Sequence, residues 1–242
     1  MRIPRIHTQQ HLETGLTLEL EEGPSRHLIK ALRLGVDAPL ILFNGAGGEY
    51  QAIISACTKK YATVLVGDYC DQNRQSPLNI ELGIGISRGE RFELVIQKAT
   101  ELGANKIVPL FTERCEVKLN QERLQKKLTQ WQHIAISACE QCQRNIVLEV
   151  GEPQHLDTWL ENTKADGKWV LHHRSEKKLT DYAQPTSAAL LIGPEGGLNE
   201  REIEQAQANG FAPLTLGPRV MRTETAPIAC ISIMQALWGD LI

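Results

Sequence analysis

The sequence lacks the features of a membrane or secreted protein. No run in its 242 residues comes near the ~18 consecutive apolar residues that a membrane-spanning helix needs. The start of the chain, Met1-Arg-Ile-Pro-Arg-Ile, holds no apolar segment of the kind found in secretion signals. Six cysteines are too sparse for the disulfide framework of a small extracellular domain. These absences predict a cytoplasmic protein.

Motifs for metals and phosphates are missing as well. Cys139 and Cys142 form one C-x-x-C pair, but the other cysteines offer no second pair, and a structural zinc site needs four ligands. We therefore expect no metal. No Walker loop occurs, and the glycine-rich segment at Gly193 does not fit the fingerprint of dinucleotide-binding proteins. The formal net charge is −3, so a nucleic-acid site would have to be a local cluster of cations.

The patterns that are present divide the chain at residues 72–77. Residues 1–71 show short alternating apolar and polar runs, which are typical of half-buried strands, and Asn44-Gly-Ala-Gly-Gly is a hairpin signal between two of them. One short helix is predicted between Pro24 and Gly35. This part is predicted to be a small β-barrel with one helix. Residues 72–77 are polar up to a proline and are expected to be a linker.

Residues 78–242 alternate strands with helices. The apolar patterns predict strands at 78–86, 106–111, 146–150, 169–171, 188–192 and 213–216, and helices at 88–102, 120–142 and 226–238. A further helix is expected to begin after Asn199. Such alternation implies an α/β domain with a mostly parallel sheet and helices on both faces.

Two strands of this domain end in loops that contain glycine. Leu190-Leu-Ile-Gly193-Pro-Glu-Gly196-Gly197 runs from a strand into a turn, after which Asn199 and Glu202 fit a capping box. The second loop, Leu216-Gly217-Pro-Arg-Val-Met-Arg222-Thr-Glu224, follows the strand at 213–216. Ligands of open α/β sheets bind at the carboxyl ends of strands, where glycine lets the backbone approach them closely. A plain strand-to-helix turn is the alternative for the first loop taken alone.

The first loop also indicates the kind of ligand. Its Glu195 would repel a phosphate but suits a cation or a hydroxyl group. S-adenosylmethionine has a sulfonium cation and a ribose diol, so it is the cofactor that we expect. The site is predicted at the strand ends and in the two loops, and comprises Leu171, Ile192, Gly193, Glu195, Gly196, Leu216, Gly217, Val220 and Met221.

The combined motifs resemble those of the SPOUT methyltransferases, and more narrowly those of the bacterial family that methylates N3 of a uridine in 16S ribosomal RNA. The resemblance covers nearly the whole chain. Besides the two loops, it rests on Met1-Arg-Ile-Pro-Arg-Ile, Ser87-Arg-Gly-Glu, Gln97-Lys-Ala-Thr-Glu-Leu-Gly, Ser137-Ala-Cys-Glu-Gln-Cys and Gly239-Asp-Leu. Two positions depart from the family pattern. Gln143 stands where the family tends to have glycine, and Pro227 where it tends to have a small or hydroxylated residue.

The resemblance implies a fold and partners. Residues 78–242 should form a SPOUT domain with a trefoil knot within about 188–242, a feature too rare for sequence rules to propose. Residues 1–71 should form a PUA-like RNA-binding barrel. The protein should be a homodimer that acts on 16S rRNA, within the 30S subunit.

Methylation at N3 defines what the catalytic residues must do. N3 must lose a proton, and the negative charge spreads onto O2 and O4, so the site needs a donor for those oxygens and a proton acceptor. We expect Arg222 to stabilise the anion, and Glu224 to accept the proton or to orient Arg222. The structural alternatives are an ion pair between these two residues and a helix cap formed by Glu224.

RNA contacts are expected from local cations. Arg26, Lys30 and Arg33 fall on one stripe of the predicted N-terminal helix, although a solvated helix face explains that spacing equally well. The full predicted set is Arg2, Arg5, Arg26, Lys30, Arg33, Arg88, Arg114, Arg144 and Arg219.

Two other functions stay open. The chain resembles SPOUT enzymes in general, so methylation of a tRNA base or ribose is one alternative. A non-catalytic RNA-binding factor for ribosome assembly is the other. The match along the full length favours 16S rRNA over tRNA, and the intact glycine loops with Arg222 argue against a non-catalytic role.

Overall fold

The computed structural model describes residues 3–116, 120–172, 175 and 177–242, and they form two compact units. One unit takes in the chain up to Gln75 together with Cys139–Val147, and the other takes in Ser76–Ala138 and Leu148–Ile242. The sequence patterns predict a single domain over residues 78–242. The difference arises because the last turn of a long helix and the loop after it pack with the N-terminal unit.

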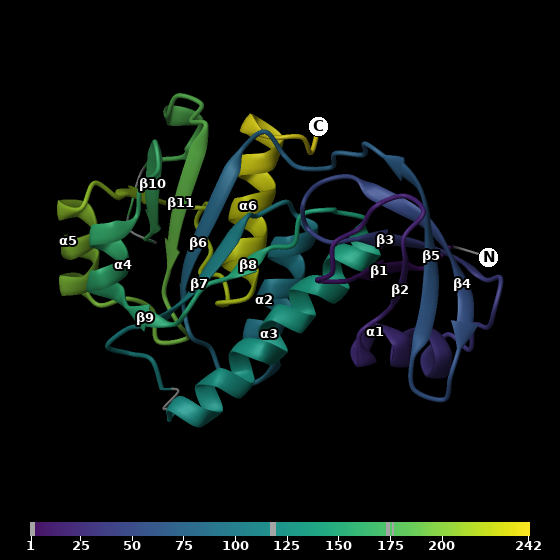
Figure 1. Ribbon diagram of the computed structural model, residues 1–242. Helices are drawn as coiled ribbons and strands as arrows, with labels where there is room; N and C mark the ends of the chain where they lie inside the picture. The colour runs from purple at the N-terminus through teal and green to yellow at the C-terminus, as the bar shows by residue number, and fades with distance from the viewer. Residues whose placement is uncertain (1–2, 117–119, 173–174, 176) are drawn as a thin grey trace. The chain divides into compact units, whose positions relative to one another are not determined.

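The N-terminal unit contains a five-stranded sheet in the order β1-β3-β4-β5-β2 (Figure 1). Its strands are β1 (Arg5–His7), β2 (Thr17–Glu19), β3 (Pro39–Phe43), β4 (Glu49–Cys57) and β5 (Ala62–Cys70). The pairs are antiparallel except for β1 with β3. Both edge strands contribute to one core, because Ile6 and Leu18 belong to the same buried cluster. The sheet is therefore curved around that core, as expected for a small barrel-like domain.

One helical segment crosses this unit between β2 and β3. It begins as α1 (Glu22–Arg26) and continues as a π-helix over His27–Ala31. Leu28 is fully buried in the core, while Arg26 and Lys30 are exposed. The predicted helix is confirmed, but its wide π-helical second half was not foreseen.

The second unit is built on a parallel sheet in the order β12-β10-β11-β6-β7-β8, with β9 paired to β7. The strands are β6 (Asn79–Gly85), β7 (Lys106–Phe111), β8 (Glu149–Val150), β9 (Gln154–His155), β10 (Gly167–Leu171), β11 (Ser187–Ile192) and β12 (Ala212–Leu214). Every described pairing in it is parallel. The expected α/β class is confirmed.

Helices cover both faces of this sheet. Figure 1 shows α4 (Leu156–Asn162) and α5 (Glu200–Ala208) on one side, and α2 (Glu90–Glu101) and α6 (Thr225–Trp238) on the other. The long helix α3 (Gln121–Cys142) follows β7, and a short 3-10 helix lies at Leu179–Asp181. Helix α4 is too short to have shown a helical pattern in the sequence. None of the described helices is long and apolar enough to span a membrane.

The parallel arrangement brings the functional loops together. β11 pairs with β10, and β10 pairs with β12, so the carboxyl ends of all three strands lie at one edge of the sheet. The two glycine loops follow β11 and β12 and therefore meet there. The strand pairings do not by themselves establish how the chain threads between these loops, and the trefoil knot stays a prediction.

Candidate active site

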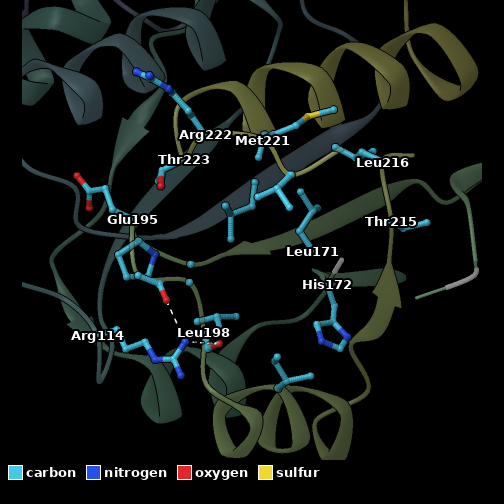
Figure 2. A pocket seen from close by; sticks show the side chains of 18 of the residues that line it. Arg114, Leu171, His172, Glu195, Leu198, Thr215, Leu216, Met221, Arg222 and Thr223 are labelled. Atoms are coloured by element: carbon cyan, nitrogen blue, oxygen red, sulfur yellow. Dashed lines mark hydrogen bonds between the residues drawn. The ribbon is translucent and has the colours of Figure 1, made fainter. Parts of the chain in front are cut away.

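A cavity of about 600 Å³ opens between the two glycine loops, the end of β10 and the start of α6. Its size is within the usual range for small-molecule sites. All nine residues predicted to bind a cofactor lie in its wall. Figure 2 shows Leu171, Leu216 and Met221 beside the central space, with Leu198 on the opposite side. The structure thus assembles the predicted site, and the role of each residue in binding stays a prediction.

The first glycine loop is shaped by its own backbone and by the cap of α5. A side chain at Gly193 could not be accommodated, because its Cβ would lie 2.7 Å from the backbone nitrogen of Leu198. Asn199 accepts a hydrogen bond from the Glu202 amide, and Glu202 accepts one from the Asn199 amide. The predicted capping box is confirmed. The loop is therefore a tight turn whose end is fixed by a helix cap.

The second glycine loop is more open. Gly217 has a φ of +84°, in the left-handed region that side chains disfavour. Residues from Gly217 to Val220 are exposed, and the Val220 side chain is 88% exposed. A loop with so little burial can change its conformation around a ligand. The exposed apolar surface of Val220 is available for contact with that ligand.

Glu195 points to a different use from the one expected. Its Oε1 accepts a hydrogen bond from the Arg88 amide at 2.9 Å and contacts the Arg91 guanidinium at 3.3 Å. In Figure 2 its side chain extends away from the cavity. The carboxylate therefore ties the first glycine loop to Arg88 in the loop after β6 and to Arg91 in α2. Glu195 still lies in the wall of the cavity, and a contact of its carboxylate with a ligand's cation or hydroxyl stays a prediction.

Arg114 holds the same loop from another side. Its Nη1 donates to the carbonyl oxygen of Gly196 at 3.0 Å and lies 3.5 Å from that of Leu198, contacts drawn in Figure 2. Glu113 adds a second link, because its amide donates to Glu202 at 2.8 Å. The loop after β7 thus braces the glycine loop. A guanidinium engaged with two carbonyls is less suited to the RNA contact predicted for Arg114.

Arg222 and Glu224 lie on the side of the cavity formed by the start of α6. Arg222 is exposed and extends away from the cavity centre in Figure 2, with no ion pair to any described residue. Glu224 precedes α6 but forms no side-chain cap, and its Oε2 is buried without a hydrogen-bond partner among the described residues. Neither structural alternative considered for these residues, the ion pair or the helix cap, is present.

Part of the apolar wall and some of its polar groups were not predicted from the sequence. Leu198, Leu214 and Ile203 line the cavity, as do His172, Thr215 and Thr223. Their position after β10 or beside the glycine loops is the only signal that could have identified them. Cys230 lies further along α6, where burial raises the pKa of its thiol well above the ordinary value, so it offers no thiolate nucleophile.

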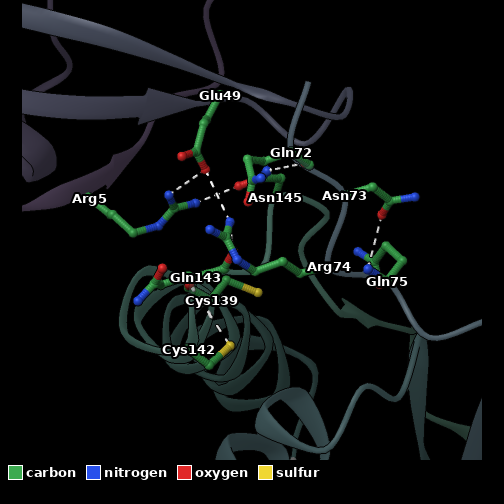
Figure 3. A network of polar contacts seen from close by, with 10 residues as sticks. All are labelled: Arg5, Glu49, Gln72, Asn73, Arg74, Gln75, Cys139, Cys142, Gln143 and Asn145. Carbon is green, nitrogen blue, oxygen red and sulfur yellow. Dashed lines mark hydrogen bonds and ion pairs between the residues drawn. The ribbon is translucent and has the colours of Figure 1, made fainter. Parts of the chain in front are cut away.

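Two of the predicted RNA contacts are contradicted by burial. Arg5 is 6% exposed, and its guanidinium contacts Glu49 Oε2 and Asn145 Oδ1, each at 2.5 Å (Figure 3). Arg144 is 4% exposed and donates to Gln75 Oε1 at 2.7 Å. Both side chains are used inside the N-terminal unit, where a buried guanidinium needs its partners, and neither can reach a phosphate.

The other predicted RNA contacts stay predictions. Arg26, Lys30, Arg33 and Arg219 are exposed. Arg88 is exposed too, and its guanidinium forms an ion pair with Glu116 at 2.9 Å. Arg2 lies outside the described residues.

Comparison with known proteins adds the family. Residues 74–235 match the RNA methyltransferase domain, and residues 22–67 match the RNA methyltransferase PUA domain. The ribosomal RNA small subunit methyltransferase E of Buchnera aphidicola subsp. Schizaphis graminum is 35% identical over 99% of this chain and 98% of its own. The Bacillus subtilis protein of the same name is 30% identical over 96% of each chain.

Solved structures agree with these relatives. The ribosomal RNA small subunit methyltransferase E of Neisseria gonorrhoeae, bound to S-adenosyl methionine, superposes with a TM-score of 0.93 at 37% identity over 100% of both chains. A Legionella pneumophila protein provisionally identified as a methyltransferase, in complex with the cofactor SAM, gives 0.97 at 44% identity, again over 100% of both chains. Proteins related this closely from end to end share a fold. This chain belongs to the RNA methyltransferase family and carries that family's PUA domain in its N-terminal part.

Proposed function

We propose that this protein methylates N3 of a specific uridine in 16S rRNA of the small ribosomal subunit, with S-adenosylmethionine as the methyl donor. The observation that carries the proposal is the buried, unpartnered Oε2 of Glu224 beside a cavity bounded by two glycine loops. Burying such an oxygen is unfavourable unless it forms a hydrogen bond, for example with a ligand. The relatives named for the small ribosomal subunit support the choice of RNA.

The cavity suits S-adenosylmethionine in size and in chemistry. Its wall combines apolar side chains, such as Leu171 and Leu216, with the backbone groups of two loops. Apolar walls with a few placed polar groups are typical of sites that bind a nucleoside. Because Glu195 is turned outward, we assign polar recognition of the cofactor to loop backbone groups and leave Glu195 with a positioning role.

The bound cofactor supplies a methyl group that is already activated as an electrophile. The residues of the chain must then make N3 nucleophilic. Glu224 would take the N3 proton onto its carboxylate, and the nitrogen lone pair left behind would form the new bond to the methyl carbon. The bond between that carbon and the sulfonium sulfur would break at the same time, its electron pair would stay on sulfur, and S-adenosylhomocysteine would leave. Arg222, free of ion pairs to described residues, would donate to the uracil oxygen on which charge collects. N3 lies on the pairing edge of uracil, so the base must enter unpaired.

Assembly and location are part of the proposal. Helix α6 buries Ile231, Met234 and Trp238 within its unit, yet Ile233 and Leu237 on the same helix are 40% and 42% exposed. This apolar stripe supports a homodimer that covers it, as the resemblance implies. Small ribosomal subunits are made in the cytoplasm, where we expect the protein to act.

The deciding experiment is to incubate purified protein with S-adenosylmethionine and 30S subunits or naked 16S rRNA from a strain that lacks this activity. Mass spectrometry of nucleosides should detect N3-methyluridine. Glu224→Gln, which keeps the shape of the side chain and removes the base, should yield about 10²-fold less product per unit time. Methylation at another atom would refute the N3 assignment, and calorimetry showing no S-adenosylmethionine binding would refute the cofactor.

A further inference from the structure

We propose that Glu202 is a positioning residue for the cofactor, because its carboxylate holds the loop after β7 against the first glycine loop. Glu202 lies in the first turn of α5 and does not itself line the cavity. The proposal rests on the proposed function, in that S-adenosylmethionine occupies the cavity. It gives this carboxylate a role beyond the capping box that its place in the sequence predicts.

The two carboxylate oxygens of Glu202 have different partners. Oε2 accepts a hydrogen bond from the Asn199 amide at 2.9 Å, which is the bond that closes a capping box. Oε1 is not needed for the box, and it accepts from the Glu113 amide at 2.8 Å, at a separation of 89 positions in the sequence. In an isolated helix this second oxygen would face water, whereas here Glu202 is only 6% exposed. One buried side chain therefore serves both a helix cap and a distant loop.

The hydrogen bonds of the sheet do not join the two loops that Glu202 connects. The strand order places β6 between β7 and β11, so the loops after β7 and β11 follow strands that are not neighbours. Glu202 bridges this separation by accepting from the Glu113 amide. Asn199 adds a second contact, because its side-chain amide donates to the Glu113 carboxylate. The loop after β7 is thus attached to the start of α5 by bonds from side chains.

The bond to Glu113 fixes the residue that follows it, Arg114. The Arg114 guanidinium donates to the Gly196 carbonyl at 3.0 Å and lies 3.5 Å from that of Leu198 (Figure 2). The two loops also approach closely along the side chain, since a Cβ placed on Gly196 would lie 3.0 Å from the Arg114 Cβ. Gly196, Leu198 and Arg114 all line the cavity. A displacement of the loop after β7 would therefore change the wall that the cofactor contacts.

Only a carboxylate can accept hydrogen bonds from both backbone amides at once. Both of its oxygens are acceptors, whereas the side chain of glutamine offers one acceptor and one donor group. Glu202→Gln keeps the size of the side chain, but its NH₂ group must face either the Glu113 amide or the Asn199 amide, and two donors repel each other. Glu202 forms no ion pair with a described residue, so the loss of its charge breaks no salt bridge there. This substitution therefore tests the hydrogen bonds themselves.

The test compares S-adenosylmethionine binding by the full-length wild type, Glu202→Gln, Arg114→Ala and the variant that combines both changes, using calorimetry. Glu202→Gln should weaken binding roughly fivefold, because a buried amide loses its acceptor and Arg114 is no longer held in place. If Glu202 acts through Arg114, the combined variant should bind within about twofold of Arg114→Ala alone. Wild-type affinity in Glu202→Gln would overturn the proposal, and so would losses that multiply in the combined variant.

The kinetic constants provide a second readout. At saturating cofactor and RNA, Glu202→Gln should keep kcat within about twofold of the wild type, since Glu202 lies outside the cavity and its effect is on cofactor binding. The KM for S-adenosylmethionine should rise with the loss of affinity. A large fall in kcat with an unchanged KM would overturn the role in cofactor binding.

The matched control is Glu204→Gly, in the same helix. Glu204 is exposed and does not line the cavity, and glycine at an exposed helical position lowers stability without removing a bond of Glu202. Glu204→Gly should lower the melting temperature and keep the wild-type affinity for the cofactor. If it weakens binding as much as Glu202→Gln does, the stability of α5, and not the position of the loop after β7, determines the affinity.

Amide hydrogen exchange separates this proposal from the proposed function. Without cofactor, residues 193–198 should exchange faster in Glu202→Gln than in the wild type or Glu204→Gly, because the contacts between the loops exist before any ligand binds. A protein that shows this difference but binds no S-adenosylmethionine would refute the proposed cofactor and leave the positioning of the glycine loop by Glu202 standing. A protein that methylates RNA, with equal exchange in all three forms, would refute the role of Glu202 and leave the proposed function standing.

Discussion

Arg222 and Glu224 stand two residues apart, and their side chains lie in opposite environments. Arg222 is exposed at the edge of the cavity, whereas one carboxylate oxygen of Glu224 is buried without a partner in the described part of the chain. An exposed guanidinium next to a cavity can move onto a ligand at little cost. A buried carboxylate oxygen without a hydrogen-bond partner lacks the interactions that water would give it, so a donor on a ligand can occupy that position.

Arg222→Ala should therefore lower kcat by about 10²–10³ and leave the affinity for S-adenosylmethionine nearly unchanged, because the lost hydrogen bond matters mainly in the transition state. Arg222→Lys should recover only part of the rate, since an ammonium lacks the planar fork. Steady-state kinetics and calorimetry measure the two quantities. If Arg222→Ala reacts at the wild-type rate, another residue must stabilise the uracil anion, and Arg219 is the next residue to test.

Gln143 carries a second residue-scale effect. It follows the last residue of α3 with a φ of +70°, in the left-handed region where helices commonly end on glycine. This explains why the family tends to have glycine there. Its carbonyl oxygen accepts from Arg74 at 3.2 Å, a contact that needs no side chain at position 143.

Gln143→Gly should raise the free energy of unfolding by about 1 kcal/mol, because it removes the clash of Cβ in the left-handed conformation. For a chain of this size the melting temperature should rise by roughly 2–4 °C. Gln143→Ala is the control, since it shortens the side chain but keeps Cβ, and it should show no such gain in calorimetry. Equal effects of both substitutions would mean that the side chain, and not the backbone, sets the stability here.

Among the elements, the loops after β6 and β7 give the first glycine loop its shape. The loop after β6 supplies the Arg88 amide to Glu195, and the first turn of α2 supplies Arg91 to the same carboxylate. The loop after β7 supplies Arg114 to the carbonyls of Gly196 and Leu198. The glycine loop has few side chains of its own to pack. Its conformation therefore depends on bonds from neighbouring strands of the sheet.

Arg114→Ala should weaken S-adenosylmethionine binding about tenfold, because a charged donor to the loop carbonyls is lost and the loop samples other conformations. The rate at saturating cofactor should fall much less. Arg88→Ala, which breaks the exposed pair with Glu116 but keeps the amide that Glu195 needs, should bind the cofactor nearly as the wild type does. Equal affinities in all three proteins would show that the loop holds its shape unaided.

For the whole molecule, the exposed apolar stripe of α6 predicts self-association. Ile233→Arg/Leu237→Arg places two like charges on that stripe and should convert a dimer to a monomer, because burying unpaired charge is strongly unfavourable. Sedimentation velocity at micromolar concentration measures the change. Leu65→Arg, at a position 37% exposed on the N-terminal sheet, should leave the dimer intact. A wild type that sediments as a monomer would contradict the expected assembly.

The sequence by itself determined the elements and the place of the site. The apolar periods define strands and helices locally, and the capping box at Asn199 depends on residues only three apart. The site follows because parallel strands end at one edge of the sheet, so the glycine loops after β11 and β12, which lie on either side of β10, meet there. Short elements such as α4 were not predicted, because seven residues form too few helical turns to show a helical period in the sequence.

Tertiary structure alone decided which polar groups are free. Glu195 finds Arg88 and Arg91 more than a hundred positions away in the chain, and Arg5 finds Asn145 at a separation of 140. The sequence alone does not show whether a charged side chain is buried in such a pair or exposed to solvent. Packing made Arg5 and Arg144 internal, turned Glu195 outward and left the Glu224 oxygen buried. These outcomes depend on contacts between distant segments, which local patterns do not encode.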